Sequence, residues 1–131
     1  MVCLDTDFLV ALLRGEPDAA KKASDIDAEG LRKTTTPVNA FELYLGAHLS
    51  GEAEKNLGLV RDLLLSLKVL DFDEASCSIA GGIASNLSRL GRPIGARDCM
   101  IAGIALRHEQ GLISRNTEHF SRVKGLKVSS W

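Results

Sequence analysis

A short apolar run that stops at an aspartate opens this sequence, and it restricts the fold more than any other feature. The run Val2–Leu4 ends at Asp5, and a second apolar stretch, Phe8–Leu13, follows. A buried strand that leads into a helix is typical of a parallel βα unit. Because ligands of open α/β sheets bind beyond the carboxyl ends of the strands, we expect Asp5 at the ligand-binding edge. For Asp5 or Asp7 taken alone, capping of the first helix is the simpler reading.

The composition is that of an ordinary globular protein. The chain has 131 residues, 45% hydrophobic and 25% charged, which fits one domain over residues 1–131. A formal net charge of −1 excludes a global positive field, so binding of a polyanion requires a local basic patch. No apolar stretch has the length of a bilayer span and no basic leader precedes the first one, so we expect neither a membrane segment nor a signal peptide.

Three cysteines, Cys3, Cys77 and Cys99, are widely spaced and lie among apolar neighbours. Their number is odd and their spacing matches neither a C-x-x-C motif nor a zinc site, which favours buried free thiols. Free thiols are typical of a reducing compartment, so we expect a cytoplasmic protein.

Strand and helix patterns alternate along the rest of the chain. Thr36-Pro37 is a strong helix start, because it places a hydroxyl at the N-cap and proline in the first turn. We expect strands at 2–4, 31–35, 69–72, 112–114 and 126–128, and helices at 8–13, 17–29, 37–50, 52–67, 73–90 and from 96 to a stop at Gly111. This order predicts an α/β fold with a mostly parallel sheet of about five strands, covered on both faces.

Apolar spacing predicts the buried faces of the longer helices. The stripes are Val38, Phe41, Leu45 and Leu49 in the helix 37–50, and Ile79, Ile83, Leu87 and Leu90 in the helix 73–90. Leucines surround so much of the helix 52–67 that we expect it either in the core or against a partner in a symmetric homodimer. The small residues Ala102, Gly103 and Ala105 predict a close approach of the last helix to the sheet.

Two further carboxylates lie on faces that the apolar pattern turns inward. Glu42 stands between Phe41 and Leu45, where a carboxylate is unfavourable unless it is paired, protonated or bound to metal. Asp98 lies in the first turn of the helix that begins near Ala96, in line with its apolar face. Solvent exposure or an arginine partner for Glu42, and helix capping for Asp98, are the simpler alternatives.

Carboxylates from three separate elements repel one another where they converge, unless a cation neutralises them. Asp5, Glu42 and Asp98 offer hard oxygen ligands without histidine or cysteine, a set that suits Mg²⁺ or Mn²⁺ rather than zinc. Such an ion keeps open positions, polarises a phosphate and generates a hydroxide nucleophile, so the set predicts phosphodiester hydrolysis.

Five segments, spread over nearly the whole chain, carry a resemblance to a known family and occur in the family's order. They are Leu4–Leu9 (LDTDFL), Thr36–Leu43 (TPVNAFEL), Pro93–Ala105 (PIGARDCMIAGIA), Ser114–Phe120 (SRNTEHF) and Gly125–Trp131 (GLKVSSW). The chain is similar to the PIN-domain ribonucleases, and most similar to the VapC toxins of type II toxin–antitoxin pairs. The resemblance implies a PIN-like three-layer α/β/α sandwich and an endoribonuclease that depends on Mg²⁺, for which Mn²⁺ substitutes. It also implies inhibition by a cognate antitoxin.

Carried over position by position, the resemblance makes Asp5, Glu42 and Asp98 the metal-binding and catalytic acids. The family's fourth acidic position falls at His119, so this chain lacks the fourth charge. A neutral His119 or Asn116 is able to hold a metal-bound water without supplying that charge, while a surface loop histidine is the simpler alternative. The possible supporting residues are Thr6, Ser114, Asn116, Glu118 and His119.

The sequence specifies contacts with RNA and with a protein partner less closely than it specifies the metal-binding acids. Arg97 and Arg115 are expected near the strand ends and are our candidate phosphate contacts, although single arginines are more often merely solvated. The resemblance also implies an antitoxin tail that lies in a hydrophobic groove, with a basic residue that reaches the carboxylates.

Other functions stay open. The alternatives to a toxin are a PIN-domain RNA-processing nuclease outside a toxin–antitoxin pair, and a PIN-like module that has lost catalysis and only binds a partner. A phosphoacceptor receiver domain with Asp71 as the acceptor is a more distant alternative, because Ser114-Arg115 follows the late strand where a receiver has a lysine.

Overall fold

The computed structural model describes residues 1–131 and contains one five-stranded sheet. Its strands are β1 (Val2–Leu4), β2 (Lys33–Thr35), β3 (Lys68–Val69), β4 (Gly111–Ile113) and β5 (Val128–Ser129). Their order is β3-β2-β1-β4-β5, and all neighbouring pairs are parallel. The predicted parallel sheet is therefore confirmed, with the first strand at its centre.

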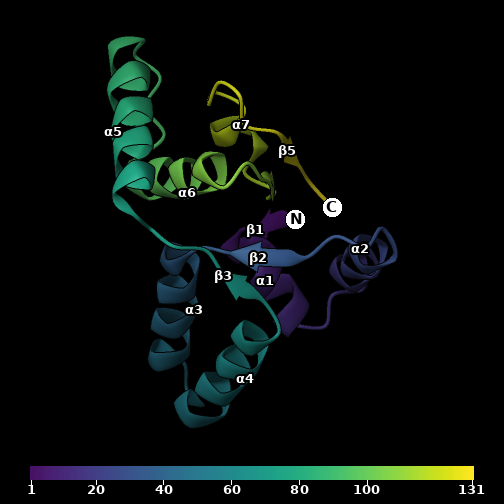
Figure 1. Ribbon diagram of the computed structural model, residues 1–131. Helices are drawn as coiled ribbons and strands as arrows, with labels where there is room; N and C mark the ends of the chain where they lie inside the picture. The colour runs from purple at the N-terminus through teal and green to yellow at the C-terminus, as the bar shows by residue number, and fades with distance from the viewer.

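Seven helices cover this sheet. They are α1 (Thr6–Leu13), α2 (Pro17–Ala28), α3 (Pro37–Leu49), α4 (Ala53–Leu65), α5 (Glu74–Arg89), α6 (Ala96–Arg107) and α7 (Thr117–Phe120). Figure 1 shows α5, α6 and α7 on one side of the strands and α1, α3 and α4 on the other. The three layers match the expected α/β/α sandwich. Only α7 escaped prediction, because four residues are too few to show a helical period.

The two strands at the centre of the sheet are buried for different reasons. In β1, Cys3 packs into the cluster on the α5–α6 side and Leu4 into the cluster on the α1–α3 side. The neighbouring strand β2 is built of threonines, and Thr34 and Thr35 are fully buried. Their hydroxyls donate to the carbonyls of Val2 (3.1 Å) and Leu4 (2.8 Å), so no polar group of these side chains is left unsatisfied.

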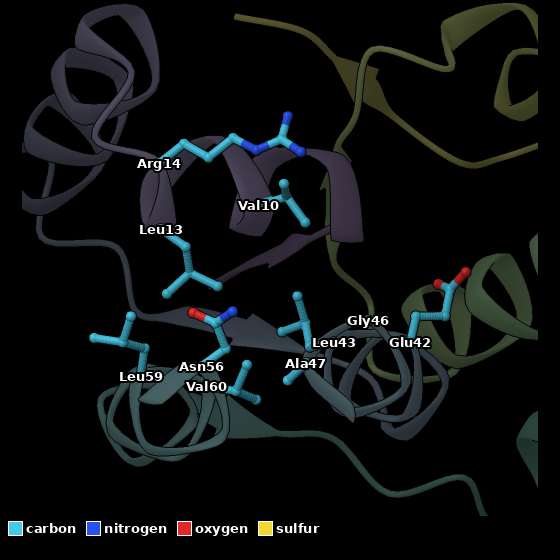
Figure 2. Close-up of a pocket in the computed structure, with 10 residues that line it drawn as sticks. All are labelled: Val10, Leu13, Arg14, Glu42, Leu43, Gly46, Ala47, Asn56, Leu59 and Val60. Atoms are coloured by element: carbon cyan, nitrogen blue, oxygen red, sulfur yellow. The ribbon is translucent and has the colours of Figure 1, made fainter. Parts of the chain in front are cut away.

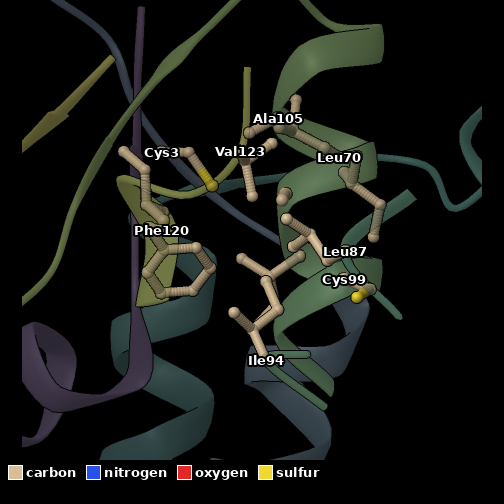
Figure 3. Packing of buried hydrophobic residues seen from close by; sticks show 12 residues of the cluster. Cys3, Leu70, Leu87, Ile94, Cys99, Ala105, Phe120 and Val123 are labelled. Atoms are coloured by element: carbon tan, nitrogen blue, oxygen red, sulfur yellow. The ribbon is translucent and has the colours of Figure 1, made fainter. Parts of the chain in front are cut away.

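Helix α6 is the most buried helix and places Asp98 at its inner start. Its inner face carries Ile101, Ala102 and Ala105, all fully buried as predicted. Figure 3 shows the cluster that this face shares with Cys3 of β1, Leu87 of α5 and Phe120 of α7.

The close approach predicted for α6 occurs on a different side. A methyl group at Gly103 would lie 2.8 Å from the backbone nitrogen of Ala80, so the glycine faces α5 and not the sheet. In α5 the predicted inner face is correct for Ile83 and Leu87. Ile79 is only half-buried, and Leu90 follows the helix as its C-cap and is 62% exposed.

The face predicted for α3 is wrong. Phe41, Leu45 and Leu49 are exposed, at 64%, 45% and 78%, and only Val38 of that stripe packs against the core. The buried residues of α3 are Asn39, Leu43 and Ala47. Hydrophobic periodicity undervalues a small alanine and a polar asparagine, so the rotation of this helix could not be predicted from the leucines.

The leucine-rich helix α4 packs against the core, which is one of the two environments expected for it. Val60 is buried, and Leu57, Leu63 and Leu64 pack against the cluster on the α1–α3 side. Leu63 and Leu64 are half-buried in this packing, and the homodimer expected from the sequence stays a prediction. Among the leucines of this helix, only Leu59 and Leu65 are exposed.

All three cysteines are free thiols. Burial raises the pKa of Cys3 to about 12, and burial also raises the pKa of Cys99. Cys77 lies exposed on α5, so the prediction of a buried thiol is wrong at this position. No helix of the protein combines the length and the apolar character that crossing a membrane requires.

Candidate functional site

Three carboxylates from distant parts of the sequence meet at the carboxyl ends of the central strands. Asp5 follows β1, Glu42 lies one turn inside α3, and Asp98 lies in the first turn of α6. All three contact a single guanidinium, that of Arg97. The predicted convergence of the three acids is therefore present in the structure.

Arg97 uses a different nitrogen for each acid. Its Nε donates to Glu42 Oε2 (2.6 Å) and one terminal nitrogen donates to Asp5 Oδ1 (3.0 Å). The other terminal nitrogen donates to Asp98 Oδ1. Burial disfavours the charged guanidinium, but the hydrogen bond to Glu42 and the charges of the three acids outweigh this and raise the pKa of Arg97. The side chain predicted to contact RNA phosphate is thus directed at the carboxylates here.

Asp5 both caps α1 and belongs to the carboxylate cluster, so the two readings of this residue are compatible. Its Oδ1 accepts from the amide of Thr6 (2.9 Å) and from Nδ2 of Asn39 (2.9 Å). Its Oδ2 accepts from the hydroxyl of Ser114 (2.7 Å), which follows β4. The carboxylate is 2% exposed, and these donors fix its orientation.

Asn39 is a site residue that the sequence did not reveal. It is fully buried, and its amide nitrogen also donates to the hydroxyl of Thr6 (2.9 Å). Its Oδ1 accepts from the hydroxyl of Thr36, the N-cap of α3 (2.6 Å). Its place three residues before Glu42 puts both side chains on one face of α3, and this spacing was the available signal.

Thr6 links Asn39 to Glu42. The Thr6 hydroxyl donates to Glu42 Oε1 (2.7 Å), while Glu42 Oε2 faces Arg97. The Glu42 side chain is 27% exposed, so it is neither turned out to solvent nor buried without partners. Thr6 and Ser114, both predicted as supporting residues, therefore contact the cluster.

Asp98 is held from the opposite side by α7 and the turn before it. Its Oδ2 contacts Nδ2 of Asn116 (3.0 Å) and Nδ1 of His119 (2.9 Å). His119, which stands where the family has its fourth acid, thus pairs with Asp98 and is not an isolated surface histidine. Glu118 does not join the cluster: its side chain is 85% exposed and pairs with Arg122.

Asp7 lies next to the carboxylate cluster, although it was not among the predicted site residues. Its Oδ2 accepts from the amide of Arg115 (2.9 Å), and its Oδ1 is buried without a hydrogen-bond partner. Burial raises the pKa of Asp7, and the charge of Asp5 adds to this against the lowering effect of the Arg115 amide. The Arg115 guanidinium is turned away and lies over the ring of Trp131, 4.2 Å from its centroid.

An apolar groove of about 300 Å³ begins beside the cluster and runs between α1, α3 and α4. Figure 2 shows Glu42 at one rim of this groove and Arg14 at another. Its floor and walls are lined mainly by Val10, Leu13, Leu43, Ala47, Leu59 and Val60.

The donor set fits a hard divalent cation in chemistry and in convergence. Three carboxylate oxygens, from Asp5, Glu42 and Asp98, lie within the span of one guanidinium. With Arg97 between them, the acids are not arranged as a preformed metal site. A compact cation in place of the guanidinium would face the same oxygens. Asp71, the acceptor of the receiver alternative, is exposed and makes no side-chain hydrogen bond.

The sequence is similar to characterised proteins along its whole length. The PIN domain family model matches residues 2–126. The chain is 32% identical over 128 residues to the tRNA(fMet)-specific endonuclease VapC of Shigella flexneri, covering 98% of this chain and 96% of that protein. It is 30% identical over 129 residues to ribonuclease VapC1 of Haemophilus influenzae, with the same coverage of 98% and 96%.

Comparison with solved structures gives the same result. The fold matches a chain of the DNA-bound VapBC of Salmonella typhimurium with a TM-score of 0.89 and 28% identity, covering 100% and 99% of the two chains. VapBC-1 of Haemophilus influenzae gives a TM-score of 0.89 and 29% identity, with coverage of 100% and 98%. The matches in sequence and in structure agree, and the chain belongs to the PIN domain family, within its VapC group.

Proposed function

We propose that this protein is a metal-dependent endoribonuclease that acts as the toxin of a VapBC-type toxin–antitoxin pair. The observation that carries the proposal is the convergence of Asp5, Glu42 and Asp98 on one point, in a PIN-domain chain with VapC ribonucleases as relatives. We propose these three residues as the catalytic and metal-binding acids, with Mg²⁺ as the ion and Mn²⁺ as a substitute.

Each acid has one oxygen that faces Arg97 and one that other groups of the protein hold. Ser114 holds the outer oxygen of Asp5, Thr6 that of Glu42, and Asn116 and His119 that of Asp98. These contacts orient the inner oxygens before any ligand binds, which is what a metal-ligand support does. A bound divalent ion would supply Lewis-acid activation of the scissile phosphate and a hydroxide nucleophile at neutral pH.

His119 takes over a positioning role at the family's fourth acidic position. Because imidazole and the amide of Asn116 add no negative charge, the proposal is for one ion and not two. The contact between His119 Nδ1 and Asp98 Oδ2 (2.9 Å) makes the histidine a partner of an acid.

RNA is the proposed substrate, and a tRNA is the first RNA to test, because the Shigella relative is named for tRNA(fMet). The proposed protein partner is a cognate antitoxin, since the structural neighbours are VapBC complexes. The apolar groove beside Glu42 is the proposed binding site of an antitoxin segment. A cytoplasmic location fits three free thiols.

A cleavage assay with purified protein and a tRNA(fMet) transcript tests the proposal. We expect cleavage that requires Mg²⁺ or Mn²⁺ and falls by roughly 100-fold or more in Asp98→Asn and in Glu42→Gln, because each loses a ligand charge worth several kcal/mol. Glu118→Gln is the matched control, since Glu118 lies near α6 but is exposed and paired with Arg122. Intact RNA with the wild type at millimolar Mg²⁺ and Mn²⁺ would favour a PIN-like module without catalysis.

The role in the cell needs a second measurement. A toxin should arrest growth when expressed alone and be neutralised by co-expression of the small protein encoded next to it. Cleavage without such a neighbour would favour an RNA-processing nuclease.

A further inference from the structure

The cation at the centre of the carboxylate cluster belongs to the protein itself. Arg97 donates to Asp5 Oδ1, Glu42 Oε2 and Asp98 Oδ1, and its side chain is 36% exposed. Three converging acids would otherwise repel one another. The guanidinium therefore stabilises their grouping in the absence of any ligand.

We propose that Arg97 is an internal counter-ion that competes with the divalent cation for the same three oxygens, so that metal binding requires its side chain to move out. The inference rests on the proposed metal site and adds a residue that opposes its occupation. Within each carboxylate, one oxygen contacts Arg97 and the other contacts a different group of the protein.

The oxygens that Arg97 does not use are engaged elsewhere. Asp5 Oδ2 accepts from Ser114 (2.7 Å) and Glu42 Oε1 accepts from Thr6 (2.7 Å). The remaining oxygens of all three acids point to Arg97. A cation that binds this cluster thus has only the oxygens that the guanidinium already occupies. A divalent ion bound to these oxygens and a guanidinium still beside them would also repel each other strongly in a half-buried site.

The position of Arg97 favours its release once the acids are neutralised. It is the second residue of α6, where the helix dipole and the free amides place positive charge. The N-cap is Gly95, which offers no side-chain acceptor. Apart from a long hydrogen bond to the Thr6 hydroxyl (3.4 Å), only the three acids hold the guanidinium at this end. A divalent ion that neutralises the acids therefore removes most of the interactions that keep the guanidinium there. Its partial exposure gives it a way to solvent.

Calorimetric titration of Mn²⁺ into the metal-free protein tests the inference independently of RNA cleavage. Arg97→Gln removes the competing charge, and we expect it to bind Mn²⁺ at least about fivefold more tightly than the wild type, within the usual range of coupling between sites. Without metal it should melt at a lower temperature than the wild type, and Mn²⁺ should raise its Tm by a larger amount. Arg97→Lys keeps the charge and should bind nearer to the wild-type affinity.

Arg115→Gln is the matched control, because the Arg115 guanidinium lies over Trp131 and contacts none of the three acids. Equal or weaker Mn²⁺ binding by Arg97→Gln, with clear binding by the wild type, would overturn the competition and leave the proposed nuclease intact. Absence of Mn²⁺ binding in every variant would overturn the competition together with the metal site. Binding by Arg97→Gln alone would support it in its strongest form.

Discussion

At the scale of single residues, the site depends on polar side chains that carry no charge. Asn39 joins Asp5, Thr6 and Thr36, and it is fully buried at the start of α3. Each of its contacts satisfies a group that is also buried or half-buried. A buried amide in such a network contributes most through the partners that would lose it.

Replacement of Asn39 by alanine should therefore destabilise the fold and loosen Asp5. We expect a loss of about 1–3 kcal/mol in the free energy of unfolding, since the hydroxyl of Thr36 and the carboxylate of Asp5 both lose a partner. Urea denaturation measures this change. Asn86→Ala, at an exposed position of α5, is the control and should change stability by less than about 0.5 kcal/mol. Equal stability of the two variants would show that the Asn39 network is not needed.

The residues found from sequence and those missed differ in kind. Asp5, Glu42 and Asp98 were predicted because each is a charge on a face that the apolar pattern turns inward. Asn39 was missed because a neutral amide after a helix N-cap is common in solvated helices. An arginine partner for Glu42 was one of the alternatives, but the sequence did not identify it as Arg97 or show that it contacts all three acids. Nothing in the spacing says whether an arginine points inward or outward.

At the scale of elements, α5 and α6 approach each other very closely at Gly103. A Cβ at Gly103 would lie 2.8 Å from the nitrogen and 2.9 Å from the Cα of Ala80. Backbone atoms cannot move aside as a side chain can. Because α6 also carries Asp98, this contact helps to set the depth of the carboxylate cluster.

Gly103→Ala should destabilise the protein even though alanine is the better helix former. The gain in helix propensity is about 1 kcal/mol, while forcing two helices apart typically loses about 1–3 kcal/mol. The matched control is Gly82→Ala in α5, where nothing lies within 4 Å of an added Cβ, and it should raise the Tm. A higher Tm for Gly103→Ala would mean that the helices separate without strain.

The cap of α5 gives a prediction about pH. The hydroxyl and the amide of Ser76 both donate to Asp73 Oδ1, at 2.7 and 2.8 Å, and these bonds lower the pKa of Asp73 from 3.8. A carboxylate with a lowered folded-state pKa stabilises the fold above its unfolded pKa and loses this effect as the pH falls through the folded value. The Tm gap between wild type and Asp73→Ala should therefore be wide at neutral pH and should narrow as the pH falls through the lowered folded-state pKa of Asp73.

Asp73→Asn separates capping from charge in the same experiment. Asparagine caps helices about as well but does not titrate in this range, so its Tm should stay nearer to that of the wild type at neutral pH. A gap for Asp73→Ala that is the same at neutral and acidic pH would contradict the role of the ionised cap.

The order and type of the elements followed from the sequence, while the rotation of α3 and the environment of α4 did not. Capping residues and glycines fixed the limits of α3 and α5 within one or two residues. The apolar pattern predicted the wrong buried face for α3, because two of the three buried residues, Asn39 and Ala47, are polar or small. It could not decide between core and interface for α4, since both environments bury leucine.

At the scale of the whole molecule, the outer face of α3 is the main apolar surface left open near the site. Phe41, Leu45 and Leu49 are exposed there at i, i+4 and i+8. Contiguous exposed apolar side chains mark interaction surfaces. If the protein is the homodimer that we expect, this stripe is its best candidate interface, in place of α4.

Sedimentation of two double variants separates the two helices. Phe41→Glu with Leu45→Glu should give a folded monomer, because both side chains are exposed in the single chain. Leu63→Glu with Leu64→Glu should instead lower the Tm by several degrees, since both pack against the core. A dimer that survives the α3 substitutions with unchanged affinity would exclude this face.

The different burial of the three thiols has a practical consequence. Maleimides react with thiolates, and burial holds Cys3 and Cys99 as inaccessible thiols of raised pKa. Cys77 is exposed on α5, a helix that contributes no side chain to the carboxylate cluster. The native chain should therefore accept a single fluorophore at Cys77 without mutagenesis, which would allow binding of a partner to be followed by fluorescence anisotropy.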